Sequence, residues 1–197
     1  DDATITIPTM MVSQNDGAAI YAKLDASETV SINMYKKDLS RVFKDSSFDN
    51  AIVAHEWGHY ISNRLVGNSS GLSNFQGRAM GEGWGDFHAL LLLSEEKDTA
   101  VLGNENYDGA YSSTSYVAPF TSGIRRAPYS TNMEINPLSF RHIESGMGAD
   151  VGLPGTNVES PHAAGEVWAA TLWDAFVALA NDDSHSFVEA KNLMKDY

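Results

Sequence analysis

The spacing of two histidines constrains this chain more than any other feature of its sequence. His55 and His59 stand four residues apart, and Glu56 follows directly after the first of them. On an α-helix, residues i and i+4 lie one above the other on the same face, so both imidazoles can reach one point in space. Apolar residues around the motif recur at helical spacing and predict a helix over residues 49–66.

This H-E-x-x-H pattern is typical of a zinc site. Neutral imidazole nitrogens and carboxylate oxygens are proper ligands of Zn²⁺. His55 and His59 are therefore candidate ligands, and Glu56 is the candidate base that takes a proton from a zinc-bound water. The alternative is a pair of surface histidines beside a solvated glutamate. Because apolar residues surround the motif, that alternative would leave unpaired polar groups in the core, which is costly.

A catalytic zinc ion needs a third protein ligand. The extension H-E-x-x-H-x-x-G-x-x-H is excluded, because it needs a glycine where the chain has Ser62 and a histidine where it has Leu65. The other standard arrangement takes a glutamate from a following helix, and Glu82 supplies it. Asp86 lies one turn further on the same face, where it can accept the free N–H of a ligating histidine, which we expect to be His55. Without the preceding histidine motif, Glu82 and Asp86 would be explained as the solvated acidic start of a helix, because acidic residues favour the first turn.

The rest of the chain predicts strands first and helices afterwards. Polar and apolar residues alternate over short segments before residue 48, whereas apolar residues recur at helical spacing beyond it. We therefore divide the chain into residues 1–48, which we expect to be β-rich, and residues 49–197, which we expect to be mainly helical, to carry the zinc site and to stop at Tyr197 in mid-pattern. Together they form one catalytic unit. The predicted strands are 4–7, 19–22 and 29–35, and the further helices are 81–94, a short one near 137–142, and two that begin at Ser160 and near Ser186.

The composition argues against several classes of partner. The formal net charge of −13 disfavours both nucleic acid and anionic membrane surfaces. The absence of cysteine excludes disulfides and any cysteine-based zinc site. The longest apolar run, 89–93, is far shorter than the roughly 18 residues of a membrane span. Acidity could also attract structural Ca²⁺, although a solvated helix end is the simpler explanation of the acidic segment 181–183.

Four segments, in this order along the chain, resemble the fungalysin family of secreted zinc endopeptidases. The resemblance implies an α+β, thermolysin-like fold with a β-rich N-terminal lobe, a helical C-terminal lobe and the zinc helix between them. It also implies secretion as a precursor with a removable pro-segment, and protein or peptide substrates. The four segments are FDNAIVAHEWGHYISNRL at 48–65, GEGWGDF at 81–87, GIRRAPYST at 123–131 and HAAGEVWA at 162–169.

The resemblance also implies roles for further residues. His162 is similar to the histidine that stabilises the tetrahedral oxyanion, and Arg125 or Arg126 is similar to an arginine that hydrogen-bonds a substrate carbonyl. The alternatives are an ordinary polar residue in a first helical turn and a surface arginine. A helix N-terminus disfavours a cationic histidine, so His162 would need an acidic partner. The candidate partners are Asp150, Glu159 and Glu166, and the candidates for an oxyanion-assisting tyrosine are Tyr60, Tyr116 and Tyr129.

The expected activity is that of a zinc-dependent endopeptidase. A zinc-bound water attacks the scissile carbonyl while Glu56 takes its proton and later delivers it to the leaving amine. One alternative is an aminopeptidase with the same zinc ligands, which would need acidic residues to hold the free amine of the substrate. The other is an inactive or truncated, zinc-stabilised binding module, against which the intact Glu56 argues.

Overall fold

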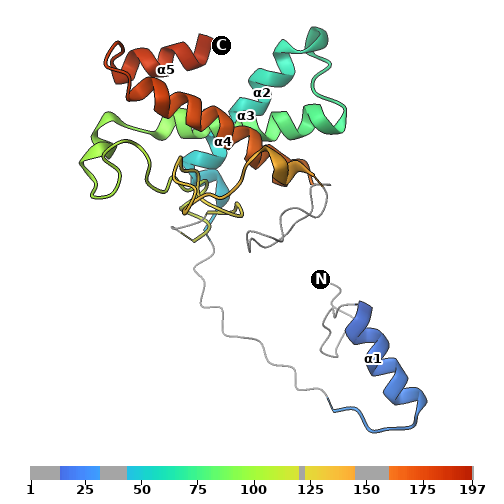
Figure 1. Cartoon of the computed structure of the whole chain (residues 1–197). Coiled ribbons are helices and arrows are strands. Elements are labelled where there is room, and N and C mark those ends of the chain that lie inside the picture. The colour runs from blue at the N-terminus through green and yellow to red at the C-terminus, as the bar shows by residue number, and fades with distance from the viewer. Residues whose placement is uncertain (1–13, 32–43, 120–122, 145–159, 197) are drawn as a thin grey trace. The chain divides into compact units, whose positions relative to one another are not determined.

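The structure is a computed structural model that describes residues 14–31, 44–119, 123–144 and 160–196 (Figure 1). The chain divides into two compact units, Asp1–Val42 and Phe43–Tyr197. The division at residue 48, between an upper lobe and a zinc-binding lobe, stays a prediction. Each unit is described below by itself.

The described part of the first unit is helical. Helix α1 spans Gln14–Asp25, so the predicted strand at 19–22 is wrong. Alanine has the highest helix propensity, and a short alternating segment with no neighbouring strand cannot be told from a helix by its pattern. Asp16 in the first turn and Lys23 in the last turn complement the helix dipole. The predicted strand at 4–7 lies outside the described residues, and the described part of 29–35, residues 29–31, is irregular.

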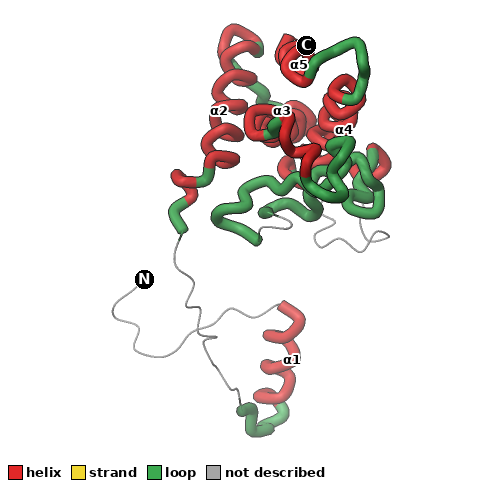
Figure 2. Tube along the Cα trace, turned by 90° about the vertical axis from the view of Figure 1, so that its left-hand side faces the viewer, coloured by secondary structure: helices red, strands yellow, loops and turns green. Residues whose placement is uncertain are grey.

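The predicted α+β fold with a β-rich N-terminal lobe is therefore wrong. Figure 2 shows helices and loops throughout the described residues, with no strand among them. Their only extended pairing is an isolated antiparallel bridge between Tyr111 and Tyr129. Alternation predicts a strand only where a pleated surface has partners to pack against, and the described residues provide none. The described part of the chain looks like the helical lobe alone.

Four α-helices form the framework of the second unit. Helix α2 spans Asn50–Leu65, α3 spans Phe75–Leu93, α4 spans Pro161–Ala180 and α5 spans Phe187–Asp196. The predictions for α2, α4 and α5 are confirmed, and the short helix near 137–142 is a 3₁₀ turn at Phe140–Ile143. Within the described residues, no helix is both long and apolar enough to cross a membrane.

Side-chain caps explain where the two ligand-bearing helices begin. Oδ1 of Asp49 accepts a hydrogen bond from the backbone of Ala51 at 3.0 Å and starts α2. Its other oxygen, Oδ2, accepts hydrogen bonds from the backbone N–H groups of Tyr116 and Val117. These bonds attach the irregular segment between α3 and α4 to the start of α2. Helix α3 begins earlier than the predicted residue 81, because Asn74 caps it by accepting from the backbone of Gly77 at 2.7 Å.

Helix α3 packs against both α2 and α4 (Figure 2). Gly83 of α3 faces Gly165 of α4 so closely that a Cβ atom on Gly83 would lie 2.6 Å from the Gly165 carbonyl oxygen. This contact brings the residue before Gly83, the predicted ligand Glu82, against the start of α4. The core beside it consists mainly of Phe87, Leu90, Leu91, Tyr107, Tyr129, Trp173, Phe176, Val177 and Phe187.

Candidate metal centre

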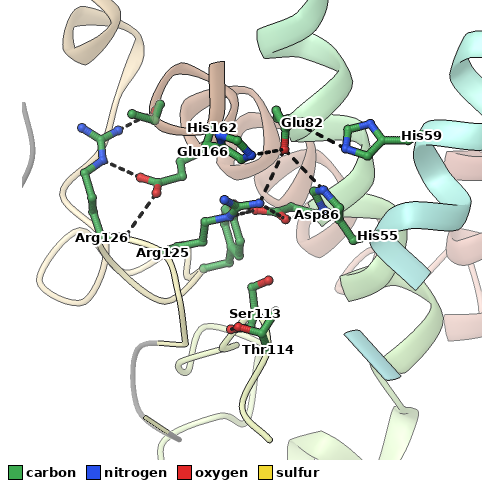
Figure 3. Close-up of polar contacts among 12 residues, drawn as sticks. His55, His59, Glu82, Asp86, Ser113, Thr114, Arg125, Arg126, His162 and Glu166 are labelled. Carbon is green, nitrogen blue, oxygen red and sulfur yellow. Dashed lines mark hydrogen bonds and ion pairs between the residues drawn. The ribbon is translucent and has the colours of Figure 1, made fainter. Parts of the chain in front are cut away.

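Helices α2 and α3 bring the three predicted zinc ligands together (Figure 3). Nε2 of His55 lies 3.3 Å from Oε2 of Glu82, and Nε2 of His59 lies 3.5 Å from Oε1 of the same carboxylate. One ligand atom from each residue lies within 4.8 Å of the other two. The i, i+4 spacing on α2 presents both imidazoles to Glu82, as the sequence predicts.

The residues of this cluster fit a zinc ion. Oε2 of Glu82 is buried and accepts no hydrogen bond, although His55, His162 and Arg125 approach it to 3.3–3.8 Å. A metal ion bound there would satisfy this oxygen directly. Two imidazole nitrogens and one carboxylate oxygen are the donor set of many catalytic zinc sites. Burial would raise the pKa of the Glu82 carboxyl, but the imidazoles of His55 and His59 outweigh it and hold the pKa below its ordinary value.

Asp86 lies behind His55, on the side away from Glu82. Nδ1 of His55 donates a hydrogen bond to Oδ1 of Asp86 at 2.7 Å, which leaves Nε2 of the same ring for a metal. Burial would lower the pKa of His55, but the hydrogen bond to Asp86 and the neighbouring Glu82 outweigh it and raise the pKa to about 9. In the metal-free protein, His55 is therefore cationic at neutral pH.

Asp86 is itself held by two residues from the irregular segment between α3 and α4. Nε of Arg125 donates to Oδ2 at 2.6 Å, Nη2 donates to Oδ1 at 2.8 Å, and the hydroxyl of Tyr129 also donates to Oδ2. Burial would raise the pKa of Asp86, which is 2% exposed, but the hydrogen bonds with His55 and Arg125 keep it low. The result is a buried carboxylate whose charge is fully paired.

The contact between Tyr129 and Asp86 was not predicted from the sequence, in which Tyr129 is only a candidate for an oxyanion-assisting tyrosine. Its side chain is 1% exposed, and burial together with the charge of Asp86 raises the pKa of its hydroxyl well above the ordinary value. The hydroxyl thus stays protonated and donates its hydrogen bond to the Asp86 carboxylate. Tyr129 lies 43 residues after Asp86 in an irregular segment, where neither helical nor strand periodicity indicates a partner.

His162 occupies the first turn of α4, and its ring points toward Glu82 (Figure 3). Its Nε2 atom lies 3.4 Å from Oε2 of Glu82, although the side chain remains 60% exposed. Of the predicted acidic partners, Glu166 contacts Arg126 instead, and Asp150 and Glu159 lie outside the described residues. The carboxylate nearest to His162 among the described residues is thus the candidate zinc ligand.

The two adjacent arginines have different surroundings. Arg125 has its guanidinium on Asp86 and 3.8 Å from Oε2 of Glu82. Arg126 forms a buried ion pair with Glu166, and Figure 3 shows it pointing away from the histidine cluster. The predicted contact of either arginine with a substrate stays a prediction.

Glu56 is exposed on α2, next to His55. Among the described residues, its side chain forms no hydrogen bond or ion pair, so the carboxylate is available to a bound molecule. An open cavity of about 390 Å³ also adjoins the cluster and is lined in part by His59 and Glu82. The site therefore combines a metal-binding donor set with a cavity beside it, and α2 also carries an unpaired carboxylate.

Comparisons with known proteins agree with this geometry. The family model described as fungalysin metallopeptidase (M36) matches residues 1–194. Extracellular metalloproteinase 2 of Trichophyton tonsurans is 32% identical over 169 residues, which cover 84% of this chain and 23% of that protein. Extracellular metalloproteinase 4 of Arthroderma otae is 39% identical over 145 residues, which cover 72% of this chain and 19% of that protein. The chain thus spans less than a quarter of the length of these relatives.

Proposed function

Because the chain belongs to the fungalysin metallopeptidase family, we propose that it provides the zinc-binding site of an endopeptidase that cleaves peptide bonds within proteins. The observation that supports this most is the convergence of His55, His59 and Glu82, whose ligand atoms lie within 4.8 Å of one another. A zinc ion held by these residues would act as a Lewis acid and lower the pKa of a bound water toward neutrality.

Glu56 is the proposed general base and acid. It accepts a proton from the attacking water and then donates it to the amine that leaves. Two features support this role. Its side chain is exposed beside His55, and no other group of the described residues engages its carboxylate.

His162 and Arg125 are the proposed partners of the substrate. The N–H of the His162 ring donates a hydrogen bond to the oxygen on which negative charge develops, a role supported by its 3.4 Å distance from Glu82. Of the two predicted arginines, Arg125 is the better candidate for a contact with a substrate carbonyl. Its guanidinium lies 3.8 Å from Glu82, whereas that of Arg126 is tied to Glu166.

The relatives are named extracellular metalloproteinases, which supports secretion of this protein too. A removable pro-segment and structural Ca²⁺ are further proposals that rest on the family resemblance and on the acidity of the chain. Binding of nucleic acid or of an anionic membrane is not proposed, in keeping with the net charge of −13.

Cleavage of a peptide with both termini blocked tests the endopeptidase proposal. We expect chelator-sensitive cleavage, and a loss of roughly 10²–10⁴-fold in the Glu56→Gln variant with its zinc content unchanged. The exposed Glu134 provides the matched control, since Glu134→Gln should cleave at the parental rate. Cleavage of free-amine peptides alone would favour an aminopeptidase. Bound zinc without any cleavage would favour a binding module.

A further inference from the structure

A buried ion pair joins the loop that carries Arg125 to the start of α4. Nε of Arg126 donates to Oε2 of Glu166 at 2.6 Å, and the backbone N–H of Arg126 donates to Oε1 at 3.2 Å. Nη2 of Arg126 donates to the carbonyl oxygen of Ala163 at 2.5 Å. The two side chains are only 8% and 5% exposed. Arg126 thus contacts a backbone carbonyl in the first turn of α4 and a side chain in the following turn.

The first turn of α4 is the one that carries His162. Ala163 follows His162 directly, and Glu166 is four residues further on, so it lies on the same face of α4 one turn later. Ser160 occupies the N-cap position but forms no side-chain capping hydrogen bond. Among the described residues, the hydrogen bond from Nη2 of Arg126 to the Ala163 carbonyl oxygen is therefore the side-chain hydrogen bond that holds the backbone of this first turn.

Packing alone does not hold the ring of His162 in place, because its side chain is 60% exposed. The position of an exposed side chain follows from the backbone to which it is attached and from the few contacts that it makes. For His162 the contact is the 3.4 Å approach to Glu82, which a small shift of the first turn would abolish. A displacement of about 1 Å at a reacting group can lower a rate about 10²-fold.

The neighbouring arginine fixes the other side of the site. Arg125 holds Asp86 on α3, whereas Arg126 holds Glu166 on α4, and the two guanidinium groups point in different directions (Figure 3). The segment that carries both arginines therefore fixes the position of α3, which bears Glu82, relative to α4, which bears His162. A buried ion pair adds little stability beyond what a hydrophobic pair of the same volume adds, but its directional hydrogen bonds fix one arrangement.

We propose that Arg126 and Glu166 are positioning residues that set the first turn of α4 so that His162 faces the metal centre. This role rests on the proposed function of the site, in which His162 stabilises the oxyanion. Arg126 itself contacts Glu166 and Ala163 and none of the three candidate metal ligands.

A double-mutant cycle with His162 tests the catalytic consequence. In the full chain, Arg126→Gln should lower kcat about 10–100-fold with KM changed less than about twofold, and Glu166→Gln should act alike. In a His162→Ala background, Arg126→Gln should lower kcat no further. Arg126→Lys keeps the charge but not the planar fork, so it should restore only part of the rate. An equal loss with and without His162 would overturn the proposal.

A second measurement does not depend on peptidase activity. In the Co²⁺-loaded chain, the ring protons of His162 should show paramagnetic NMR shifts, which Arg126→Gln should largely remove while leaving those of His55 and His59. Val177→Ala, a core variant elsewhere on α4, is the control for simple destabilisation and should keep the His162 shifts. Unchanged His162 shifts in Arg126→Gln would overturn the positioning role. An inactive parental chain with the expected shifts would instead count against the proposed function.

Discussion

The Nδ1 atom of His55 lies 2.7 Å from Oδ1 of Asp86, a carboxylate that is 2% exposed and lies on the side of the ring away from Glu82. This contact fixes the orientation of the ring and directs Nε2 toward the Glu82 carboxylate. Because Asp86 also accepts hydrogen bonds from Arg125 and Tyr129, the orientation of His55 depends on the loop as well as on the two helices.

Asp86→Asn should weaken zinc binding about 10–100-fold, because the partner that orients His55 loses its charge while keeping its shape. Competition with a chromophoric chelator measures the affinity. Asp183, an exposed aspartate after α4, provides the control, and Asp183→Asn should bind zinc as the parent does. Equal affinities for the parent and Asp86→Asn would show that Asp86 has no effect on the metal.

Zinc binding should release a proton from His55 and strengthen with rising pH up to about 9. The pKa of His55 is raised to about 9 in the metal-free protein, so zinc must displace a proton below that pH. Calorimetric titrations in buffers of different ionisation enthalpy count the released protons. Affinity should increase nearly tenfold per pH unit between about pH 7.5 and 8.5, and less steeply as the pH approaches about 9. A flat profile over this range would contradict the prediction.

The same raised pKa predicts how the stability of the metal-free chain depends on pH. The folded state binds the His55 proton more tightly than the unfolded state, whose histidine has the ordinary value of 6.5. The contribution of His55 to the free energy of unfolding is therefore complete below pH 6.5 and is lost as the pH rises toward about 9. Urea unfolding of the metal-free parent at several pH values measures it. Asp86→Asn should show a smaller loss, and an equal loss would point to another group.

Tyr129→Phe should lower the free energy of unfolding by about 1.5–3 kcal/mol, because it removes a buried hydrogen bond to a charged carboxylate. Zinc content should remain that of the parent, since Arg125 still pairs with Asp86. Urea unfolding and metal analysis provide the two readings. Tyr60→Phe is the matched control, because Tyr60 is 54% exposed and its hydroxyl has no partner among the described residues. Equal losses in both variants would contradict the role of the hydroxyl.

Gly83→Ala should separate α3 from α4 at the point where the third ligand lies. The new Cβ atom would lie 2.6 Å from the carbonyl oxygen of Gly165 and 2.8 Å from Cδ1 of Trp168, so one helix must move. We expect destabilisation of about 1–3 kcal/mol, measured by thermal unfolding, together with weaker zinc binding through the adjacent Glu82. Parental stability would show that the two helices tolerate a methyl group between them.

The site was more predictable from the sequence than the fold. His55, His59 and Glu82 follow from helix geometry, because residues four apart share a face and a catalytic zinc ion needs a third ligand. The segment around residues 19–22 was assigned to a strand, since a short alternation does not exclude a helix. Arg125 and Tyr129 reach Asp86 from an irregular loop, and the sequence carries no periodic signal for such contacts.

The coordination of zinc in the purified chain tests the central claim most directly. Metal analysis and X-ray absorption spectroscopy should show one zinc per chain, bound to two imidazoles and one carboxylate at about 2.0–2.2 Å. His59→Ala and Glu82→Gln should each lose most of the metal, whereas His185→Ala, at a half-buried position outside the cluster, should keep it. A parental chain without zinc, or full zinc content in both ligand variants, would contradict the proposed metal centre.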